Sequence, residues 1–359
     1  MIKKIYNVIG LMSGTSLDGL DICWVRFSKG LVWKYEIMAS ETLNYDEGIK
    51  SNLKNAINLS SNDLNTLDKD YTFFLGGVIN TFIKNKGINN IDAICNHGHT
   101  IFHKPENGIT YQLGNLPELS NYLENIVVCD FRIQDVEMGG QGAPLVPIGD
   151  ELLFSQYDYC INLGGFSNIS FKDKSHRVAF DICPTNIVLN YYSSHIGLDF
   201  DNEGKLASQG ELCKTLLNKL NSISFYKREY PKSLGYEWVT DEIIPLISKS
   251  KLDIKSILRT FVEHIAVQIT LALKNRDYKN GLWTGGGIYN SFLINRISEN
   301  LNYQIRLPAD DLINYKEALI FAFLGVLRLR NDINCLSSVT GAINDHSSGK
   351  IYYPNQGKP

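Results

Sequence analysis

The chain has 359 residues, of which 44% are hydrophobic and 20% charged, an ordinary balance for a globular protein of about two domains. Its net charge is −3 without any block of like charge, so composition gives no support for a nucleic-acid partner or an anionic membrane surface. The cysteines are odd in number (seven) and form no CxxC motif, so we expect buried thiols in a reducing cytosol, with no disulfide and no tightly bound transition metal.

The first part of the chain alternates apolar runs with a turn rich in Gly, Ser and Asp. Two lysines precede the first apolar run, but no small-residue cleavage site follows, so we expect a first strand here rather than a signal peptide. The segment SGTSLDGLD is a predicted turn between the first two strands. The predicted strands of this part are Val8–Met12, Ile22–Phe27, Leu31–Ile37, Ile91–Cys95 and Ile126–Cys129.

The pattern of strand, glycine turn and strand then recurs. Tyr159–Leu163 is followed by GGFSN and by the predicted strands Ile169–Phe171 and Arg177–Asp181. Apolar residues recur at helical spacing from Ile257 to Ile269, which predicts an amphipathic helix. The apolar run Ala318–Leu327 is shorter than the roughly 20 residues of a membrane span and predicts a core helix. Two such units predict two similar α/β halves.

Three glycine-rich turns have the composition of phosphate-binding or nucleotide-binding loops. They lie within Gly10–Asp21, Asn162–Asn168 and Gly285–Gly287, where the missing Cβ atoms let a backbone approach a ligand closely. Asp18 and Asp21 offer carboxylates for Mg²⁺. The alternative for each segment is a plain turn. The sequence contains neither GxxxxGK[ST] nor GxGxxG, which disfavours a Walker-type NTPase and a dinucleotide fold.

Four other side chains have a chemical and a structural interpretation. His97 and His99 are two residues apart, so on one strand both would face the same side as a metal pair. The alternative, hydrogen-bonding histidines beside a pocket, is favoured because no acidic ligand is close in sequence. Arg132 either binds a carboxylate or phosphate with its planar fork or pairs with a neighbouring aspartate. Asp181 is either a helix cap or a carboxylate near a transferable phosphate.

Taken together, these segments resemble the anhydro-N-acetylmuramic acid kinase family. GLMSGTSLDGLD closely resembles the family signature, and the similarity continues in family order through NHGHTIFH, DFRIQD, GGQGAPLVP, NLGGFSN, FDICPTN, DFDNEGKLASQG, PKSLGYEW, TGGGIYNSFL, Glu317 and TGA. The resemblance implies an α/β fold of the two-domain actin/hexokinase-like (ribonuclease H-like) ATPase type, with mixed sheets and an interdomain ATP cleft. The expected domains are 1–130 plus 335–359, and 131–334.

The function implied by this resemblance is an ATP-dependent and Mg²⁺-dependent kinase of peptidoglycan recycling. Such an enzyme opens 1,6-anhydro-N-acetylmuramic acid with water and phosphorylates O6, giving N-acetylmuramic acid 6-phosphate. A cytoplasmic location, a small-molecule sugar as substrate and a homodimer are further expectations. The alternatives are a non-catalytic actin-like regulator that binds ATP or sugar, and a metal hydrolase built on the histidine segment.

The resemblance also assigns residues to roles. Asp181 is the expected catalytic base, and the sugar is expected to contact His97, Arg132 and Glu317. No metal site made by protein side chains is expected, because Mg²⁺ is held mainly through ATP, with Asp18 or Asp21 as additional ligands. The expected ATP-binding residues are Gly14, Thr15, Ser16, Leu17, Asp18, Gly19, Leu20, Asp21, Gly164, Asn168, Gly285, Gly286, Gly287 and Asn290.

The chain departs from the family at two of these motifs. The family usually reads GHGQT, where this chain has His99, and FDTGPGN, where it has Ile182, Cys183 and Thr185. A β-branched residue in place of glycine disfavours a positive φ at Thr185. Asp181 is retained, so the predicted catalytic role survives while the fit to the substrate is open.

Overall fold

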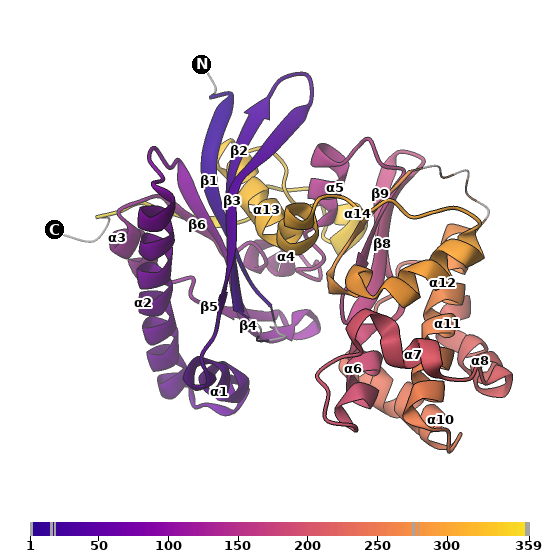
Figure 1. The fold of residues 1–359 in the computed structure, drawn as a ribbon. Helices are drawn as coiled ribbons and strands as arrows, with labels where there is room; N and C mark the ends of the chain where they lie inside the picture. Colours follow the sequence, from indigo (N-terminus) through magenta and orange to yellow (C-terminus); the bar gives the residue numbers. More distant parts are fainter. Residues whose placement is uncertain are drawn as a thin grey trace. The chain divides into compact units, whose positions relative to one another are not determined.

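The chain folds into two compact units (Figure 1). The computed structural model describes residues 3–14, 17, 19–274, 276, 278 and 280–355. Unit 1 comprises Met1–Leu153 and Tyr315–Pro359, and unit 2 comprises Phe154–Asn314. The domain boundaries expected from sequence, near residues 131 and 334, therefore fall inside unit 1.

Unit 1 is built on a mixed seven-stranded sheet. Its order is β11-β6-β4-β1-β2-β3, and β5 pairs with β4. β1, β2 and β3 form an antiparallel meander, whereas β4 runs parallel to both β1 and β6. The strands are β1 (Ile5–Ser13), β2 (Gly19–Lys29), β3 (Trp33–Asn44), β4 (Ala93–Lys104), β5 (Ile109–Leu113), β6 (Val127–Cys129) and β11 (Lys350–Tyr352).

The helices of unit 1 cover the two faces of this sheet, with α2 on one side and α13 on the other (Figure 1). In α2, the Ser60 hydroxyl accepts a hydrogen bond from the Asp63 N–H, and Gly87 ends the helix with φ 62°. The helices are α1 (Glu47–Asn55), η1 (Ala56–Asn58), α2 (Ser61–Lys86), η2 (Pro105–Asn107), α3 (Glu118–Leu123), α4 (Ile133–Glu137), α5 (Pro147–Leu153), α13 (Asp310–Leu329) and α14 (Ser337–Thr340).

Unit 2 is built on a mixed four-stranded sheet with the order β10-β7-β8-β9. β7, β8 and β9 are antiparallel, and β10 runs parallel to β7. Its strands are β7 (Tyr159–Leu163), β8 (Phe166–Asp173), β9 (His176–Pro184) and β10 (Gly281–Thr284). Its helices are α6 (Asn186–Ser194), η3 (Asn202–Gly204), α7 (Lys205–Gln209), α8 (Lys214–Asn221), η4 (Ser224–Lys227), α9 (Tyr236–Trp238), η5 (Val239–Ile243), α10 (Ile244–Ser248), α11 (Ile254–Leu273), η6 (Gly286–Tyr289) and α12 (Ser291–Leu301).

The two sheets share one topology. In each, the first three strands form an antiparallel meander and the next strand of the sheet joins the first in parallel, which gives the order β3-β2-β1-β4 in unit 1 and β9-β8-β7-β10 in unit 2. This is the arrangement of a ribonuclease H-like unit. The prediction of two α/β halves with mixed sheets is confirmed.

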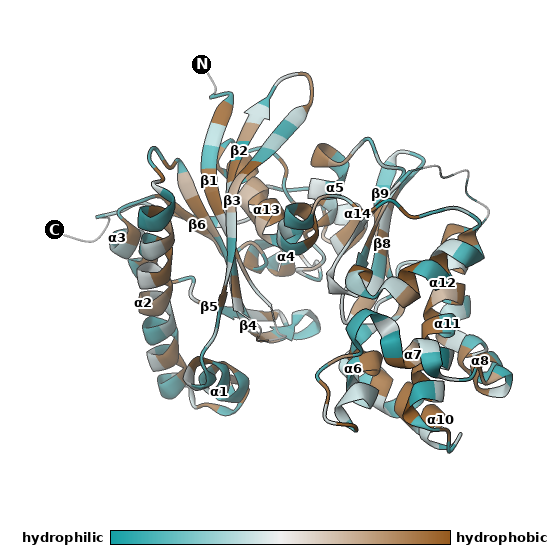
Figure 2. Ribbon diagram, in the orientation of Figure 1, coloured by the Kyte–Doolittle hydropathy of each residue, from teal (hydrophilic) through white to brown (hydrophobic). Residues whose placement is uncertain are grey.

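The helix α13 packs unusually closely on the unit 1 sheet. A Cβ atom placed on Gly10 of β1 would lie 1.9 Å from the Ala318 carbonyl oxygen, and one placed on Gly325 of α13 would lie 2.1 Å from the Cys95 sulfur. Because both residues are glycines, the backbone of α13 lies closer to the strands β1 and β4 than any side chain at these positions would allow. Figure 2 shows both hydrophilic and hydrophobic parts of α13, and its stretch Ala318–Leu327 is buried, as expected of the core helix predicted there.

The helix α11 is the corresponding core element of unit 2. The Asp253 carboxylate caps its start by accepting from the Ser256 N–H at 3.1 Å. The helix is long and apolar enough to span a membrane by length and composition, but 72% of its apolar window is buried inside the protein. It contains the predicted helix Ile257–Ile269 and packs in the hydrophobic core of unit 2.

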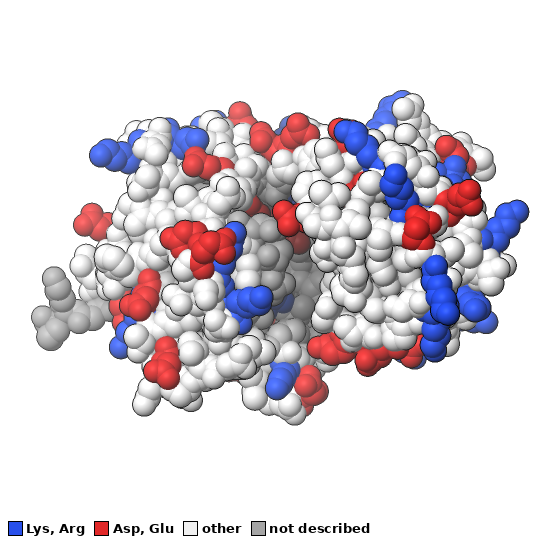
Figure 3. Space-filling view, turned by 60° about the horizontal axis from the view of Figure 1, so that its bottom comes forward, with Lys and Arg blue, Asp and Glu red and all other residues white. Residues whose placement is uncertain are grey.

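The surface carries both signs of charge. On the face shown in Figure 3, Lys and Arg side chains are scattered among Asp, Glu and uncharged residues. This distribution agrees with the small net charge of −3 and with the absence of like-charge blocks in the sequence.

We expect Gly10→Ala to lower the free energy of unfolding by at least about 1–3 kcal/mol, because the methyl group overpacks the contact with Ala318. The matched control is Gly77→Ala in α2, where an added Cβ meets no atom within 4 Å. That change should stabilise unit 1 by about 0.5–1 kcal/mol, since alanine favours a helix over glycine. Urea denaturation of both variants measures the difference, and equal midpoints would contradict the packing argument.

Candidate functional site

The turn between β1 and β2 carries the first group of predicted phosphate ligands. Leu17 has φ 60°, and its N–H donates to the Gly14 carbonyl at 3.2 Å, which forms a tight turn. Consecutive backbone N–H groups in such a conformation can cradle an anion. Thr15, Ser16 and Asp18 lie outside the described residues.

The residues that follow this turn are fixed by the sheet. A Cβ atom on Gly19 would lie 2.4 Å from the Leu43 carbonyl oxygen, so glycine is required there for strand pairing. Leu20 is fully buried in the core, which explains this position without a ligand. The Asp21 carboxylate is half-buried and accepts a hydrogen bond from the Thr42 hydroxyl at 2.6 Å. The Asp21 carboxylate is therefore held in place next to the glycine turn.

His97 holds the Arg132 side chain in place by a hydrogen bond. The Arg132 Nε–H donates to His97 Nε2 at 3.0 Å, and its Nη1 donates to the Gly142 carbonyl at 2.7 Å. His97 Nδ1 lies 2.7 Å from the Gly98 carbonyl, which can only accept, so Nδ1 carries the proton and Nε2 the lone pair. Burial, with Arg132 as the next cause, holds the pKa of His97 well below its usual range. The imidazole is thus a neutral acceptor for Arg132.

These contacts disfavour the metal-pair interpretation of the histidine segment. Both ring nitrogens of His97 already have partners, and one partner is a cation. The prediction that His97 and His99 face the same side is wrong, because Gly98 has φ 79° and breaks the alternation of the strand. The His97 ring packs on Phe321 of α13, whereas the His99 ring packs on Tyr71 of α2, on the other face of the sheet.

His99, one of the departures from the family, is a structural hydrogen-bonding residue. Its Nδ1 lies 2.9 Å from the Ser13 hydroxyl, which also accepts from the Tyr45 hydroxyl at 2.7 Å. Burial lowers the pKa of His99 to about 4, so the ring is neutral at physiological pH. The residue fixes the end of β1, where the glycine turn begins.

Arg132 and Glu317 form the charged part of unit 1 that sequence reasoning assigned to a substrate. Burial lowers the pKa of Arg132 to about 10, and the nearby Glu317 carboxylate partly offsets this, so the guanidinium stays charged at neutral pH. Glu317 lies on α13 with an exposed side chain, next to Lys316, which pairs with Asp150 at 2.8 Å in the interior. Among the described residues, Arg132 Nη2 has no hydrogen-bond partner. This nitrogen is available to an anionic ligand.

The second glycine turn joins β7 to β8 in unit 2. The Gly164 N–H donates to the Phe166 carbonyl at 3.2 Å, which closes the turn. Thr185, the residue in place of the family's glycine, donates from its hydroxyl to the Gly164 carbonyl at 2.5 Å and lies 3.0 Å from that of Gly165. Its φ of −130° agrees with the prediction that a positive φ is disfavoured at this position.

Asn168 and Asp181 face each other across neighbouring strands. Asn168 belongs to β8 rather than to the turn, and it pairs in register with Asp181 of β9. The Asp181 carboxylate is half-buried, and its Oδ2 accepts from the Leu234 N–H at 2.8 Å. Burial raises the pKa of Asp181 to about 6, against the opposing effect of the Leu234 N–H. Asp181 lies within β9 and is not a helix cap.

In the third glycine segment, Gly285 and Gly287 are packed against neighbouring residues, whereas Gly286 is not. A Cβ atom on Gly285 would lie 2.6 Å from Asn162 Oδ1, and one on Gly287 would lie 2.9 Å from the Leu163 Cβ. A Cβ atom on Gly286 would meet no atom within 4 Å. The Asn290 side chain accepts from the Leu293 N–H at 2.9 Å and caps α12. Gly286 is therefore the position of this segment with open space beside its backbone.

Sequence reasoning missed the backbone groups that hold the candidate side chains. The Gly142 carbonyl fixes Arg132 and the Leu234 N–H fixes Asp181. Gly142 and Leu234 lie in GGQGAPLVP and PKSLGYEW, two segments on which the family resemblance rests. Every residue type except proline has both a backbone N–H and a carbonyl, so the residue type does not predict such a hydrogen bond.

Comparisons with known proteins agree on one family. The model of the family described as anhydro-N-acetylmuramic acid kinase matches residues 6–354. An anhydro-N-acetylmuramic acid kinase of Haemophilus influenzae is 33% identical over 96% of this chain and 97% of its own length. Another, of Hydrogenovibrio crunogenus, is 32% identical over 98% of this chain and 99% of its own length.

Similar solved structures include more distant proteins. The activator of the 2-hydroxyisocaproyl-CoA dehydratase from Clostridium difficile, with bound ADPNP, has 15% identity and a TM-score of 0.45 over 90% of this chain and 97% of that protein. A glucokinase of the ROK family from Streptomyces griseus, in complex with glucose and AMPPNP, has 10% identity and a TM-score of 0.40 over 89% of this chain and 98% of that protein.

We expect the Asp181 carboxyl to titrate near pH 6 instead of near its ordinary value of 3.8. Between these two pH values the folded state binds the proton more tightly than the unfolded state. The contribution of this group to the free energy of unfolding therefore decreases as the pH rises through the interval. NMR of protein labelled at the aspartate carboxyl carbon measures the midpoint, and Asp181→Asn identifies the resonance. A midpoint near pH 4 would show that the carboxylate is well solvated.

Proposed function

We propose how this chain, which belongs to the anhydro-N-acetylmuramic acid kinase family, carries out its reaction. The chain is a sugar kinase of cell-wall recycling that uses ATP. In the proposed reaction, a water oxygen bonds to C1 of 1,6-anhydro-N-acetylmuramic acid while the bond from C1 to O6 breaks. The freed O6 bonds to the γ-phosphorus of ATP while the bond from that phosphorus to the bridging oxygen breaks and ADP leaves, and the proton of the water passes to a protein base. The non-catalytic regulator is not favoured.

The glycine segments have the chemistry that a nucleotide requires. Gly14 and Leu17, joined by a backbone hydrogen bond, belong to a glycine turn of the kind that binds phosphate oxygens, and Gly286 leaves open space for a flat group. Asp21 supplies a hard carboxylate of the kind that Mg²⁺ prefers. ATP with Mg²⁺, when bound, supplies the transferable phosphoryl group and neutralises the charge that develops on it. We assign Gly14, Leu17, Asp21, Gly164 and Gly286 to this task.

The proposed mechanism rests on the surroundings of the Asp181 carboxylate. A general base is most effective when its pKa lies near the working pH, and burial raises the pKa of this carboxyl to about 6. The Leu234 N–H occupies Oδ2, which orients the carboxylate on β9 and leaves Oδ1 to accept a proton from water. At neutral pH the group is ionised and able to act.

Arg132 and Glu317 are assigned to the sugar. The hydrogen bonds to His97 and Gly142 hold two guanidinium nitrogens in place, so that Nη2 points its hydrogens to a ligand without a further loss of side-chain freedom. A lactyl carboxylate is the anionic group of this sugar and suits the guanidinium. Glu317 is assigned to the polar groups of the sugar. His97 acts indirectly, by orienting Arg132 through a hydrogen bond. A cytoplasmic location suits these roles and the seven free thiols of the chain.

The direct test incubates the purified protein with ATP, Mg²⁺ and 1,6-anhydro-N-acetylmuramic acid and then determines the mass of the sugar. A gain of both water and phosphate identifies the proposed reaction. A gain of phosphate alone would identify a simple sugar kinase, and an unchanged sugar would contradict the proposal.

Arg132→Lys should raise the KM for the sugar by about 10-fold or more and change the KM for ATP little. A lysine cannot donate to His97, Gly142 and a carboxylate in one plane, and a hydrogen bond to a charged group contributes about 1.5–3 kcal/mol. Steady-state kinetics with each substrate varied in turn measures both constants. Arg26→Lys, at an exposed position on β2, is the control. A raised KM for ATP alone would remove Arg132 from the sugar site.

Asp181→Asn should lower kcat by at least about 10²-fold and leave ATP affinity close to wild type, because an amide accepts no proton from water. The amide oxygen still accepts from the Leu234 N–H, so the fold should persist. The rate of the wild type should also fall as the pH drops below about 6, where Asp181 is protonated. Asp199→Asn, at an exposed loop position, is the control. A variant that keeps more than about a tenth of the wild-type kcat would give the base role to another group.

A further inference from the structure

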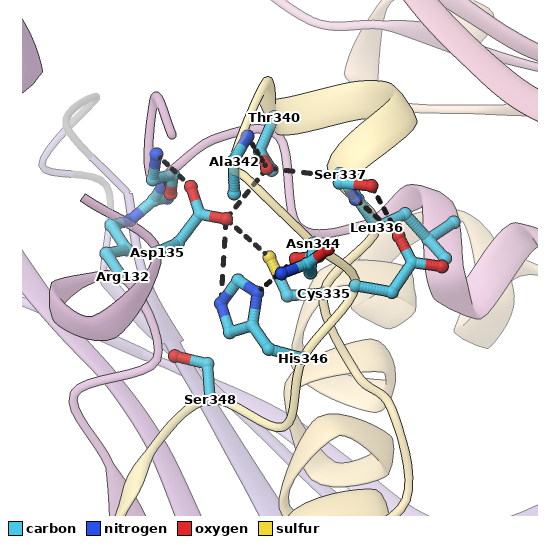
Figure 4. Close-up of polar contacts among 12 residues, drawn as sticks. Arg132, Asp135, Cys335, Leu336, Ser337, Thr340, Ala342, Asn344, His346 and Ser348 are labelled. Atoms are coloured by element: carbon cyan, nitrogen blue, oxygen red, sulfur yellow. Dashed lines mark hydrogen bonds and ion pairs between the residues drawn. The ribbon is translucent and has the colours of Figure 1, made fainter. Parts of the chain in front are cut away.

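Three side chains that commonly bind metal ions meet inside unit 1, and Gly142 connects one of them, Asp135, to Arg132 by hydrogen bonds. Asp135 comes from α4, whereas Cys335 and His346 come from the segment that follows α13 (Figure 4). Cys335 and His346 pair in an isolated antiparallel bridge, so their side chains share one face. All three residues are buried, with exposed fractions of 0%, 1% and 8% for Asp135, Cys335 and His346.

Asp135 is the centre of this cluster. Its Oδ2 accepts from the Gly142 N–H at 2.6 Å. Its Oδ1 accepts from the Thr340 hydroxyl at 2.7 Å and from the Cys335 thiol at 2.9 Å. The same Oδ1 lies 3.6 Å from His346 Nε2. The carboxylate is thus held in one orientation, with an imidazole and a thiol directed at one oxygen.

The hydrogen bonds of His346 leave one nitrogen in an unfavourable position. His346 Nδ1 lies 3.0 Å from the Asn344 carbonyl, which can only accept, so Nδ1 carries a proton. In a neutral ring, Nε2 then presents a lone pair to a carboxylate oxygen at 3.6 Å. Among the described residues, this nitrogen has no hydrogen-bond partner. Two buried acceptors that face each other require a positive charge between or on them.

We propose that Asp135, Cys335 and His346 bind one zinc-class divalent cation, a structural site separate from the kinase reaction. The ligand atoms of these residues all lie within 4.8 Å of one another and supply oxygen, sulfur and nitrogen. A thiolate together with an imidazole selects zinc over Mg²⁺ or Ca²⁺. The N–H of a metal-bound histidine usually donates to a carbonyl or carboxylate, as His346 Nδ1 does to Asn344. Water or the Thr340 hydroxyl completes four ligands.

Binding is an exchange of a proton for the metal. The S–H bond of Cys335 breaks, a bond from sulfur to the metal forms, and the proton leaves to solvent. His346 binds through the Nε2 lone pair without losing a proton. The expectation of no bound transition metal rested on the scattered cysteines and on the missing acidic ligand near His97 and His99. This cluster instead joins Asp135 to Cys335, 200 positions apart in the chain. Such a separation gives no spacing motif in the sequence.

The first experiment measures metal content. The full-length protein is incubated with one equivalent of Zn²⁺, passed over a desalting column and assayed by mass spectrometry for metal per chain. We expect about one zinc per chain, with affinity reduced by at least about 10–100-fold in Cys335→Ser and His346→Gln. The controls Cys213→Ser and His195→Asn, at positions outside the cluster, should retain wild-type zinc.

The second experiment needs only the wild-type protein, so it remains informative if the cluster variants fail to fold. Co²⁺ replaces zinc in thiolate sites and gives a charge-transfer absorption from sulfur to metal in the near ultraviolet. We expect this band, and its loss when zinc is added. A folded wild-type protein without the band, and with less than about a tenth of an equivalent of zinc, would overturn the proposal.

Discussion

The close approach of α13 to β1 and β4 is the constraint on which the rest of unit 1 depends. Without side chains at Gly10 and Gly325, the helix backbone reaches the strands directly. This places Phe321 against the His97 ring, and His97 in turn accepts the hydrogen bond that orients Arg132. The position of one charged side chain therefore depends on a glycine contact in the core. A dense interior transmits such a displacement because it has little free space to absorb it.

The same region shows how buried charge is arranged in unit 1. Lys316 pairs with Asp150 in the interior, whereas the adjacent Glu317 remains exposed and acts on Arg132. Neighbouring residues of one helix thus have different surroundings: the Lys316 charge is neutralised in the interior, and the Glu317 carboxylate lies at the surface. Removal of Asp150 would leave the buried Lys316 charge uncompensated, which is strongly destabilising.

The departures from the family are compensated by local hydrogen bonds. Thr185 donates from its hydroxyl to the carbonyl of Gly164, so its side chain ties the second glycine turn to the start of α6. His99 binds the Ser13 hydroxyl at the end of β1. In both cases a polar side chain connects to the turn that it neighbours. The backbone of the two turns is consequently supported in this chain by the side chains of Thr185 and His99.

Much of the fold follows from the sequence because it depends on local patterns. The period of apolar residues predicted β1, β2, β7 and α11, and the glycine turns marked the two sheets. The sequence does not reveal that Gly98 takes a positive φ, so the alternation rule gave the wrong face for His99. The glycine-rich sequence pattern also predicted Asn168 in a turn, although this residue lies in β8 and pairs with Asp181 of β9. Contacts between distant residues, such as Arg132 with His97, depend on topology and leave no periodic signal.

Unit 1 contains both the earliest and the latest parts of the chain, which fixes the order of assembly during synthesis. Unit 2 is one continuous segment, so all of it is synthesised before α13 is complete. Until then, the face of β1 and β4 that later contacts α13 is not covered by this helix. Val8 and Cys95 on these strands are fully buried in the folded protein. The first strands translated are therefore among the last to be fully buried.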